Sequence, residues 1–290
     1  MLAATSRQRP STSSPPIRNW SRAVCSYQRG RTAMTAEGVV LVTGGSRGIG
    51  AATATLLAKQ VQKVVIVDIA PEPLADTQTI LWPAPFDVAS ESAVVSGIAD
   101  IEAAHGPITG LVNAAGVFGK MHRIEHVRME QWDREVNIDL RGTFLVARSV
   151  GVKMAERRHG AIVNVASVAG MTSGPIHAYT AAKAGVIQIT QTLAAEWGRS
   201  GVRVNAVSPG FTRTVALEAG IASGALNRKL LESPTAMNRL LEPIEVAQAI
   251  AWLLSPMSSG VTGINLPVDA GYIAGTTWAA YGGLPEPSGA

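Results

Sequence analysis

A short apolar run followed at once by a glycine-rich octapeptide constrains the fold of this chain more than any other feature. Residues 39–42 are Val-Val-Leu-Val, which predicts a buried strand. Residues 43–50, Thr-Gly-Gly-Ser-Arg-Gly-Ile-Gly, follow directly, and residues 51–59 predict a helix. This order places backbone N–H groups at the amino end of a helix, where they can hold a pyrophosphate. The stretch therefore predicts a dinucleotide site.

The glycine turn and the end of the next strand supply the expected cofactor ligands. The turn residues expected to contact the cofactor are Gly44, Ser46, Arg47, Gly48, Ile49 and Gly50. Residues 63–67 predict a second strand, which is followed by Asp68. A carboxylate there accepts hydrogen bonds from both ribose hydroxyls and repels a 2′-phosphate, which favours NAD over NADP. Arg47 is the opposing signal, because a basic residue in this turn could meet that phosphate.

The chain then continues towards the adenine side of the predicted site. A third strand is predicted at about residues 83–86, after a connection that barely accommodates a crossover helix and contains two prolines. Asp87 and Val88 come next and are expected beside the adenine. A helix at about 90–105 then leads to a strand at 108–112.

Four small residues follow that strand, and their size lets the cofactor lie against the strand end. They are Asn113, Ala114, Ala115 and Gly116. Asn113 also fits a second role, as a turn residue that satisfies backbone groups. The two roles do not exclude each other.

The chemistry is predicted between another buried strand, residues 161–166, and a helix over residues 177–197. Tyr179 and Lys183 lie four residues apart at the start of this helix, so they share a face, and Ser167 follows the strand. A hydroxyl, a phenol and an ammonium that converge at a strand end suit proton transfer, because the ammonium stabilises the phenolate. A lone Tyr-x-x-x-Lys pattern is common by chance, however, and also fits a half-buried tyrosine beside a solvated lysine.

The last third of the chain predicts a lid. A strand at 203–207 leads to Ser208, Pro209 and Gly210, and residues 211–242 form an insertion with helical patterns at 214–221, 226–231 and 237–241. The insertion is apolar enough for a ketone or a modest ring and lacks a dense basic cluster for a phosphorylated or carrier-bound substrate. A helix at 243–254 and a final strand at 263–267 follow.

Composition indicates one large domain with tails. Of the 290 residues, 47% are hydrophobic and 16% are charged, and no apolar run reaches the roughly 18 residues of a membrane span. Cys25 is the single cysteine, which excludes an intrachain disulfide, and the five histidines lack metal-site spacing, so no metal is expected.

The basic charge of the chain belongs to its first 34 residues. These carry six arginines and no acidic residue, and the remainder has 19 basic and 21 acidic residues, a net charge of −2, which argues against nucleic-acid binding. Residues 1–34 fit a disordered extension ahead of Met34, a mitochondrial transit peptide or a basic nucleic-acid tail. We therefore expect a cytoplasmic protein, or one of the mitochondrial matrix if the segment is a transit peptide.

Four ordered motifs together resemble the short-chain dehydrogenase/reductase family over about residues 38–273. They are the turn at 43–50, the run at 113–116, the set Ser167, Tyr179 and Lys183, and residues 208–210. The resemblance implies a single-domain Rossmann fold over residues 35–275, with a doubly wound, seven-stranded parallel sheet and helices on both faces. It also implies nicotinamide-dependent redox chemistry between an alcohol and a ketone.

The same resemblance assigns roles to residues. Tyr179 is implied to be the acid and base, Ser167 to hold the substrate oxygen, and Lys183 to bind the nicotinamide ribose and tune Tyr179. Pro209, Gly210 and Thr214 are implied at the nicotinamide side. A homotetramer is implied as well, and helices at 142–158 and 178–197 that are apolar over more than one face favour such an interface.

Two departures from the family pattern bear on the mechanism. Asp139 stands where the family usually has an asparagine that holds a relay water, and its charge would favour a protonated Lys183. Asn137 could substitute only if the helix bulges, because it lies on another face. The loop between Ser167 and Tyr179 is also one residue shorter than is commonest in the family.

The sequence thus predicts an NAD-dependent enzyme that interconverts a secondary alcohol and a ketone on a polyol, cyclic alcohol or similar small substrate. One alternative is an NADP-dependent 3-oxoacyl-carrier-protein reductase, which Asp68 disfavours. Another is a non-catalytic regulatory protein that binds a dinucleotide, for which Tyr179 or Lys183 should be missing. The tail at 276–290, rich in glycine and proline, either covers a neighbour's site or is loose.

Overall fold

The computed structural model describes residues 38–60, 63–72, 74, 79–82, 85–119 and 121–285. The extension predicted at residues 1–34 lies outside these ranges, as do the last five residues of the predicted tail. No helix in the described ranges is long and apolar enough to cross a membrane.

Seven parallel strands form one sheet in the order β3-β2-β1-β4-β5-β6-β7. The strands are β1 (Val39–Thr43), β2 (Val64–Val67), β3 (Ile80–Leu81), β4 (Ile108–Asn113), β5 (Gly160–Val165), β6 (Val202–Pro209) and β7 (Asn265–Val268). The strand order reverses between β1 and β4, so the connections leave these two strands in opposite directions and open a crevice at their carboxyl ends. This arrangement confirms the predicted doubly wound Rossmann sheet.

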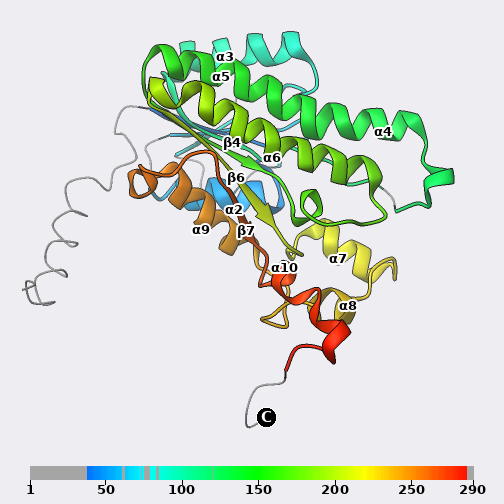
Figure 1. Ribbon diagram of the computed structural model, residues 1–290. Coiled ribbons are helices and arrows are strands. Elements are labelled where there is room, and N and C mark those ends of the chain that lie inside the picture. The colour runs from blue at the N-terminus through cyan, green and yellow to red at the C-terminus, as the bar shows by residue number, and fades with distance from the viewer. Residues whose placement is uncertain are drawn as a thin grey trace, which may run out of the picture. The chain divides into compact units, whose positions relative to one another are not determined.

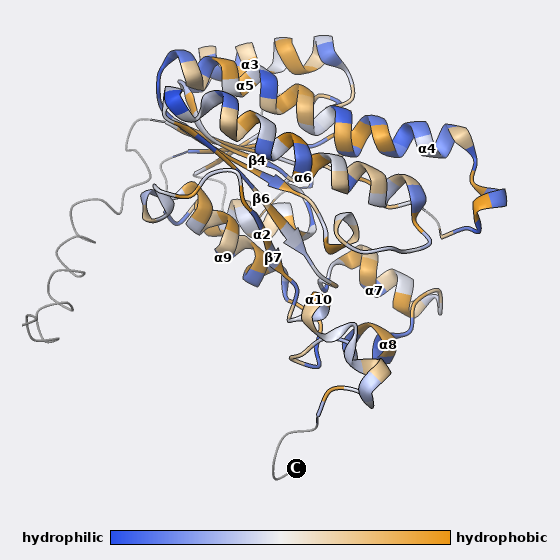
Figure 2. Ribbon diagram, viewed as in Figure 1, coloured by the Kyte–Doolittle hydropathy of each residue, from blue (hydrophilic) through white to orange (hydrophobic). Residues whose placement is uncertain are grey.

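Helices cover both faces of the sheet (Figure 1). One face carries α3 (Glu91–His105), α5 (Thr143–Glu156) and α6 (His177–Trp197), and the other carries α2 (Gly48–Leu57) and α9 (Pro243–Leu254). Side chains alternate along β1, so that Val39 and Leu41 pack under the first set and Val40 and Val42 under the second. The helices mix hydrophobic and hydrophilic residues along their length (Figure 2), because each buries only one side.

The elements beyond the carboxyl ends of the strands are shorter. Here lie α7 (Val215–Ala222), α8 (Arg228–Glu232) and α10 (Tyr272–Gly275) (Figure 1). On the other side of the crevice α4 (Met129–Val136) runs through a single π-helical stretch, η3 (Asn137–Gly142), into α5.

The third strand lies earlier than predicted. Residues 83–86 were expected to pair, but β3 is Ile80–Leu81, paired with Val64 and Val65 of β2. Residues 83–84 lie outside the described ranges, and residues 85–86 form no strand, since Pro85 lacks the backbone N–H that a ladder requires. The connection before β3 forms no helix over its described residues 68–72.

Two of the three helices predicted in the lid are present, as α7 and α8, and the third is wrong. Residues 237–241 form no helix; Leu241 instead pairs with Thr212 in an isolated parallel bridge. Asn238 has a φ of 49°, in the left-handed region, which interrupts a right-handed helix.

Candidate active site

The glycine turn packs tightly against the segment that follows β4. Gly44 has a φ of 63°, and a methyl group there would come within 2.6 Å of the Ala115 Cα. A methyl group at Gly50 would lie 2.2 Å from the Gly44 carbonyl oxygen. The turn therefore closes only without side chains, and it brings the end of β1 against Ala114 and Ala115 at the topological switch point.

The segment after β6 reaches the same turn from the other side. Thr214 caps α7 by accepting a hydrogen bond from the Leu217 N–H, and a methyl group at Gly48 would lie 3.2 Å from the Thr214 Cγ2. Pro209 ends β6, and Gly210 packs against Asp269, where a methyl group would meet the Cα at 2.8 Å. Three predicted residues of the nicotinamide side are thus grouped at the strand ends, with Thr214 at the glycine turn.

Asp68 lies beside the turn, as predicted for a ribose ligand. Its carboxylate accepts hydrogen bonds from the N–H groups of Ser46 (3.2 Å) and Ala70 (3.1 Å). Arg47, the residue that argued for NADP, forms an exposed ion pair with Glu72, with 3.4 Å between Nε and Oε1. The arginine therefore already has a carboxylate partner.

Not every predicted cofactor residue offers its side chain to the crevice. Ile49, in the first turn of α2, is partly buried and packs against the core between the sheet and that helix. Val88 is buried against Gly142, while Asp87 is exposed and accepts a hydrogen bond from the Ala89 N–H at 2.9 Å.

Asn113 ends β4 inside the core instead of forming a turn. Its Nδ2 donates to the Asn164 Oδ1 at 2.9 Å, and the Asn164 Nδ2 donates to the Thr190 Oγ1 at 2.9 Å. These bonds tie β4, β5 and α6 together. The Asn113 Oδ1 has no partner in the described part of the chain.

The structure brings Lys183, Tyr179 and Ser167 to the end of β5. The buried Lys183 ammonium donates to the Val165 carbonyl at 3.0 Å and lies 5.5 Å from the centre of the Tyr179 ring. Ser167 caps η4 (Val168–Gly170) by accepting from the Ala169 N–H, and a methyl group at Gly170 would lie 2.7 Å from the Lys183 carbonyl carbon. The half-buried Tyr179 forms no hydrogen bond within the described residues, so its hydroxyl is available to a substrate.

Asp139 completes this cluster. It is fully buried in η3; its Oδ1 accepts from the Val117 N–H at 2.7 Å, and its Oδ2 lies 4.0 Å from the Lys183 Nζ. Burial raises the pKa of Asp139 above 3.8, while the Lys183 charge and the Val117 N–H oppose that rise. Asn137 is exposed, so the π-helical bulge does not bring its side chain into the site in place of the family's asparagine.

Comparisons with known proteins identify the family over most of the chain. A family model described as enoyl-(acyl carrier protein) reductase matches residues 44–273. Cis-4-hydroxycyclohexanecarboxylate dehydrogenase of Sinomonas cyclohexanicum is 38% identical over 247 residues, which cover 82% of this chain and 98% of that protein. The chain is a short-chain dehydrogenase/reductase. Its reaction class follows: it is an NAD(P)-dependent oxidoreductase that acts on CH–OH groups.

Two further likenesses show the range of this short-chain dehydrogenase/reductase's relatives. A 2,5-dichloro-2,5-cyclohexadiene-1,4-diol dehydrogenase of Sphingobium indicum is 36% identical over 241 residues, covering 81% of this chain and 96% of that protein. A solved structure described as ribose-5-phosphate isomerase from Brucella melitensis has a TM-score of 0.81 at 41% identity, covering 88% of this chain and all of that one.

Phe118 is a residue of the site that was not predicted from the sequence. Its ring stands edge-on to the Tyr179 ring, with 5.1 Å between centroids and 69° between planes, and 58% of the residue remains exposed. The only signal was a bulky apolar residue two positions after the small run 113–116, and nothing in that pattern shows which way the loop turns. In this short-chain dehydrogenase/reductase the loop turns back over the tyrosine.

Gly50→Ala should weaken dinucleotide binding about tenfold or more, because the turn cannot close around an added methyl group 2.2 Å from the Gly44 oxygen. NADH fluorescence titration measures the affinity. Gly198→Ala is the matched control, since no heavy atom of the described residues would lie within 4 Å of its methyl group. Equal affinities for the two variants would contradict the role given to the turn.

Proposed function

We propose that this short-chain dehydrogenase/reductase interconverts a secondary alcohol and a ketone on a small alicyclic or otherwise apolar skeleton, with NAD(H) as the cofactor. The observation that carries the proposal is the Tyr179 phenol, which has no partner of its own and stands one turn from the buried Lys183 at the carboxyl end of β5. When bound, the nicotinamide cofactor accepts or supplies the hydride.

The chain's own residues handle the proton. In the oxidation, the Tyr179 oxygen takes the proton of the substrate hydroxyl as the carbinol carbon loses its hydride, so the product is a neutral ketone. Lys183 stabilises the phenolate that begins this step, because its ammonium lies 5.5 Å from the ring centre. The Ser167 hydroxyl holds the substrate oxygen; its own oxygen already accepts from the Ala169 N–H, which leaves its proton to donate.

The residues present fit a dinucleotide. The glycine turn at the end of β1 leaves a space that side chains would fill, and Ala114 and Ala115, which follow β4, pack against it. Asp68 supports NAD over NADP, because its carboxylate is held at the turn by the Ser46 N–H and would face the 2′-phosphate of NADP. Arg47 does not offset it, since Glu72 is its partner.

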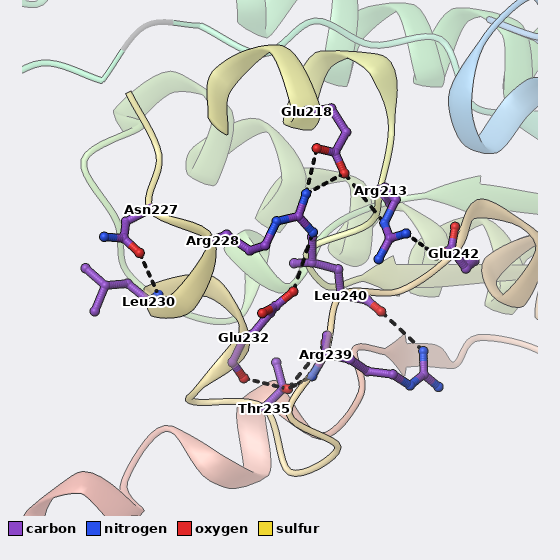
Figure 3. Close-up of polar contacts among 10 residues, drawn as sticks. All are labelled: Arg213, Glu218, Asn227, Arg228, Leu230, Glu232, Thr235, Arg239, Leu240 and Glu242. Atoms are coloured by element: carbon purple, nitrogen blue, oxygen red, sulfur yellow. Dashed lines mark hydrogen bonds and ion pairs between the residues drawn. The ribbon is translucent and has the colours of Figure 1, made fainter. Parts of the chain in front are cut away.

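The charges of the lid support a substrate without phosphate. Arg228 donates to both oxygens of Glu218, at 2.9 and 2.7 Å, and Arg213 bridges Glu218 and Glu242, at 3.5 and 3.2 Å (Figure 3). Arg239 forms two 2.7 Å bonds to Glu245. All three arginines of the lid are therefore neutralised by carboxylates.

Apolar side chains, by contrast, are left exposed around the site. Phe118 stands over Tyr179, and Val215, next to Thr214, is 76% exposed. Two of the relatives are named for substrates that contain a six-membered carbon ring, which agrees with apolar side chains around the site. Lys229 is exposed and, among the described residues of the lid, is the basic side chain without a carboxylate partner, so the lid offers one free cation and not the basic cluster that we would expect for an acyl-carrier substrate. Tyr179 and Lys183 are both present, which counts against a non-catalytic protein.

We extend the proposal to a homotetramer. Phe144 and Val152 of α5 are 37% and 45% exposed, although helices on a sheet need only one buried side. An assembly that covers this side of α5 would explain both residues, and sedimentation measures the assembly state.

Tyr179→Phe should lower turnover about a thousandfold, because it removes the group that exchanges the proton, while NADH binding stays within twofold. Initial rates and fluorescence titration give the two values. Tyr281→Phe is the control, since Tyr281 is exposed and distant in the chain from the site. Substantial turnover by Tyr179→Phe would remove the mechanism.

Asp68→Asn should shift the ratio of kcat/KM for NAD and NADP at least about tenfold towards NADP. The change removes the charge that faces a 2′-phosphate and keeps one oxygen, which can accept from only one of the two N–H groups, Ser46 or Ala70, that the carboxylate now binds. Asp100→Asn serves as the control, because Asp100 is an exposed carboxylate on α3 to which no role in cofactor binding is assigned. A wild-type enzyme that already prefers NADP would overturn this part of the proposal.

A substrate panel tests the skeleton. Initial rates should be highest on cyclic secondary alcohols, lower on polyols, and at least about tenfold lower on 3-oxoacyl thioesters, because the lid offers no unpaired arginine. Ribose 5-phosphate without cofactor tests the isomerase activity named for one structural relative. A clear preference for the thioester with NADPH would favour the acyl-carrier alternative instead.

A further inference from the structure

Phe118 places an aromatic ring beside Tyr179 and leaves more than half of the residue uncovered. The ring centre lies 5.1 Å from that of Tyr179, with 69° between the two planes, and 58% of the residue is exposed. The edge-on contact with Tyr179 therefore uses only part of the ring. A large apolar side chain that stays exposed beside a reactive group is typical of a surface that a ligand covers.

The backbone on the amino side of Phe118 is held in place. The Val117 N–H donates to the Asp139 Oδ1 at 2.7 Å, and Asp139 is fully buried. Gly116 packs beside the same group, because a methyl group there would lie 3.2 Å from the Asp139 Oδ1 and 3.5 Å from the Lys183 Nζ. The segment therefore leaves β4 bound to the buried cluster around Lys183.

The backbone on the carboxyl side of Phe118 is held by α4. A methyl group at Gly119 would overlap the Glu135 Oε1 and lie 2.6 Å from the Gln131 Nε2, so the backbone passes directly over these two side chains. Glu135 is buried, and its Oε1 accepts from the Gln131 Nε2 at 2.8 Å, one helical turn away. Phe118 thus lies between two fixed neighbours, and its ring is presented on a rigid support.

A substrate that is bound for reaction brings its skeleton to this ring. Its hydroxyl has to lie within hydrogen-bond reach of the Tyr179 oxygen, and the Tyr179 ring is in contact with Phe118. An alicyclic skeleton covers the exposed part of the Phe118 ring with C–H groups, which removes apolar surface of both partners from water. A polyol in the same place loses water from hydroxyl groups for which the phenylalanine ring has no hydrogen-bonding atom.

We propose that Phe118 is a specificity-determining residue, whose ring packs against the carbon skeleton of a cyclic alcohol or ketone and selects it over an acyclic polyol. The inference rests on the proposed function and names the part of the site that recognises the skeleton. Ser167, Tyr179 and Lys183 act on the hydroxyl, which every alcohol substrate carries, so discrimination between skeletons has to come from other side chains.

Phe118→Ala is the main test, because the residue is exposed and its truncation leaves the core intact. We expect kcat/KM for cyclohexanol to fall about tenfold, mainly through KM, since the contact forms equally in the ground state and the transition state. For D-threitol, kcat/KM should stay within about twofold. Phe118→Leu keeps much of the apolar area and should lose no more than about threefold on cyclohexanol. Val95→Ala, at an exposed apolar residue of α3, should match the wild type on both substrates.

A binding measurement separates this inference from the proposed reaction. Cyclohexanol is titrated into the complex of the enzyme with NADH, where it is not oxidised because the cofactor is already reduced, and the fluorescence of the bound NADH reports binding. The Kd for cyclohexanol should rise about tenfold in Phe118→Ala, whereas the Kd for NADH should stay within about twofold.

The outcomes distinguish the role of the ring from other roles. A fall in kcat by the same factor for cyclohexanol and D-threitol would overturn the inference, because Phe118 would then act on Tyr179 and not on the skeleton. An unchanged Kd for cyclohexanol would overturn it as well, as would a changed sedimentation coefficient of Phe118→Ala, which would mean that a second subunit covers the ring. A wild type that oxidises no alcohol in the substrate panel would instead refute the proposed function, and the titration would still report on Phe118.

Discussion

The hydrogen bond from the Lys183 ammonium to the Val165 carbonyl is the contact on which the site depends. It is buried, 3.0 Å long, and joins α6 to the last residue of β5. Because Lys183 is charged, the carbonyl at the end of a strand holds it more firmly than a neutral donor would be held. The sheet, and not a loop, therefore fixes the position of the ammonium. The electrostatic environment of Tyr179, one turn earlier, is fixed with it.

A second polar contact two turns later keeps α6 in this register. Thr190 accepts from Asn164 of β5 and donates to the Val186 carbonyl, and Asn164 in turn accepts from Asn113 of β4. Lys183 and Thr190 lie seven residues apart and so share one face of the helix. A helix attached by apolar packing alone could slide by a fraction of a turn at small cost, whereas these bonds would all be lost together. The buried amide side chains of Asn113 and Asn164 thus help to fix the position of α6, and with it that of Lys183.

Local patterns predicted the parts of the structure that local physics determines. The strand, glycine turn and helix at 39–57, and the helix that carries Tyr179 and Lys183, follow from periodicity and backbone freedom, and both are present. The third strand was misplaced because the register of a two-residue edge strand depends on its neighbour. The helix expected at 237–241 failed at Asn238, whose φ of 49° lies in the left-handed region. Phe118 was missed because the course of a loop over a distant helix leaves no periodic trace in the sequence.

The buried charged side chains lie together at the candidate site, where they serve function more than stability. Among the described residues the buried charged side chains are Glu135, Asp139 and Lys183, and Asp139 interacts electrostatically with each of the other two. Burying an ion pair is seldom a net gain, because desolvation offsets the attraction. The arginines of the lid, in contrast, sit in partly exposed pairs that water screens and that contribute little each. Desolvated charge therefore lies at the candidate site, where the chemistry can use it, whereas the charges of the lid are paired near water.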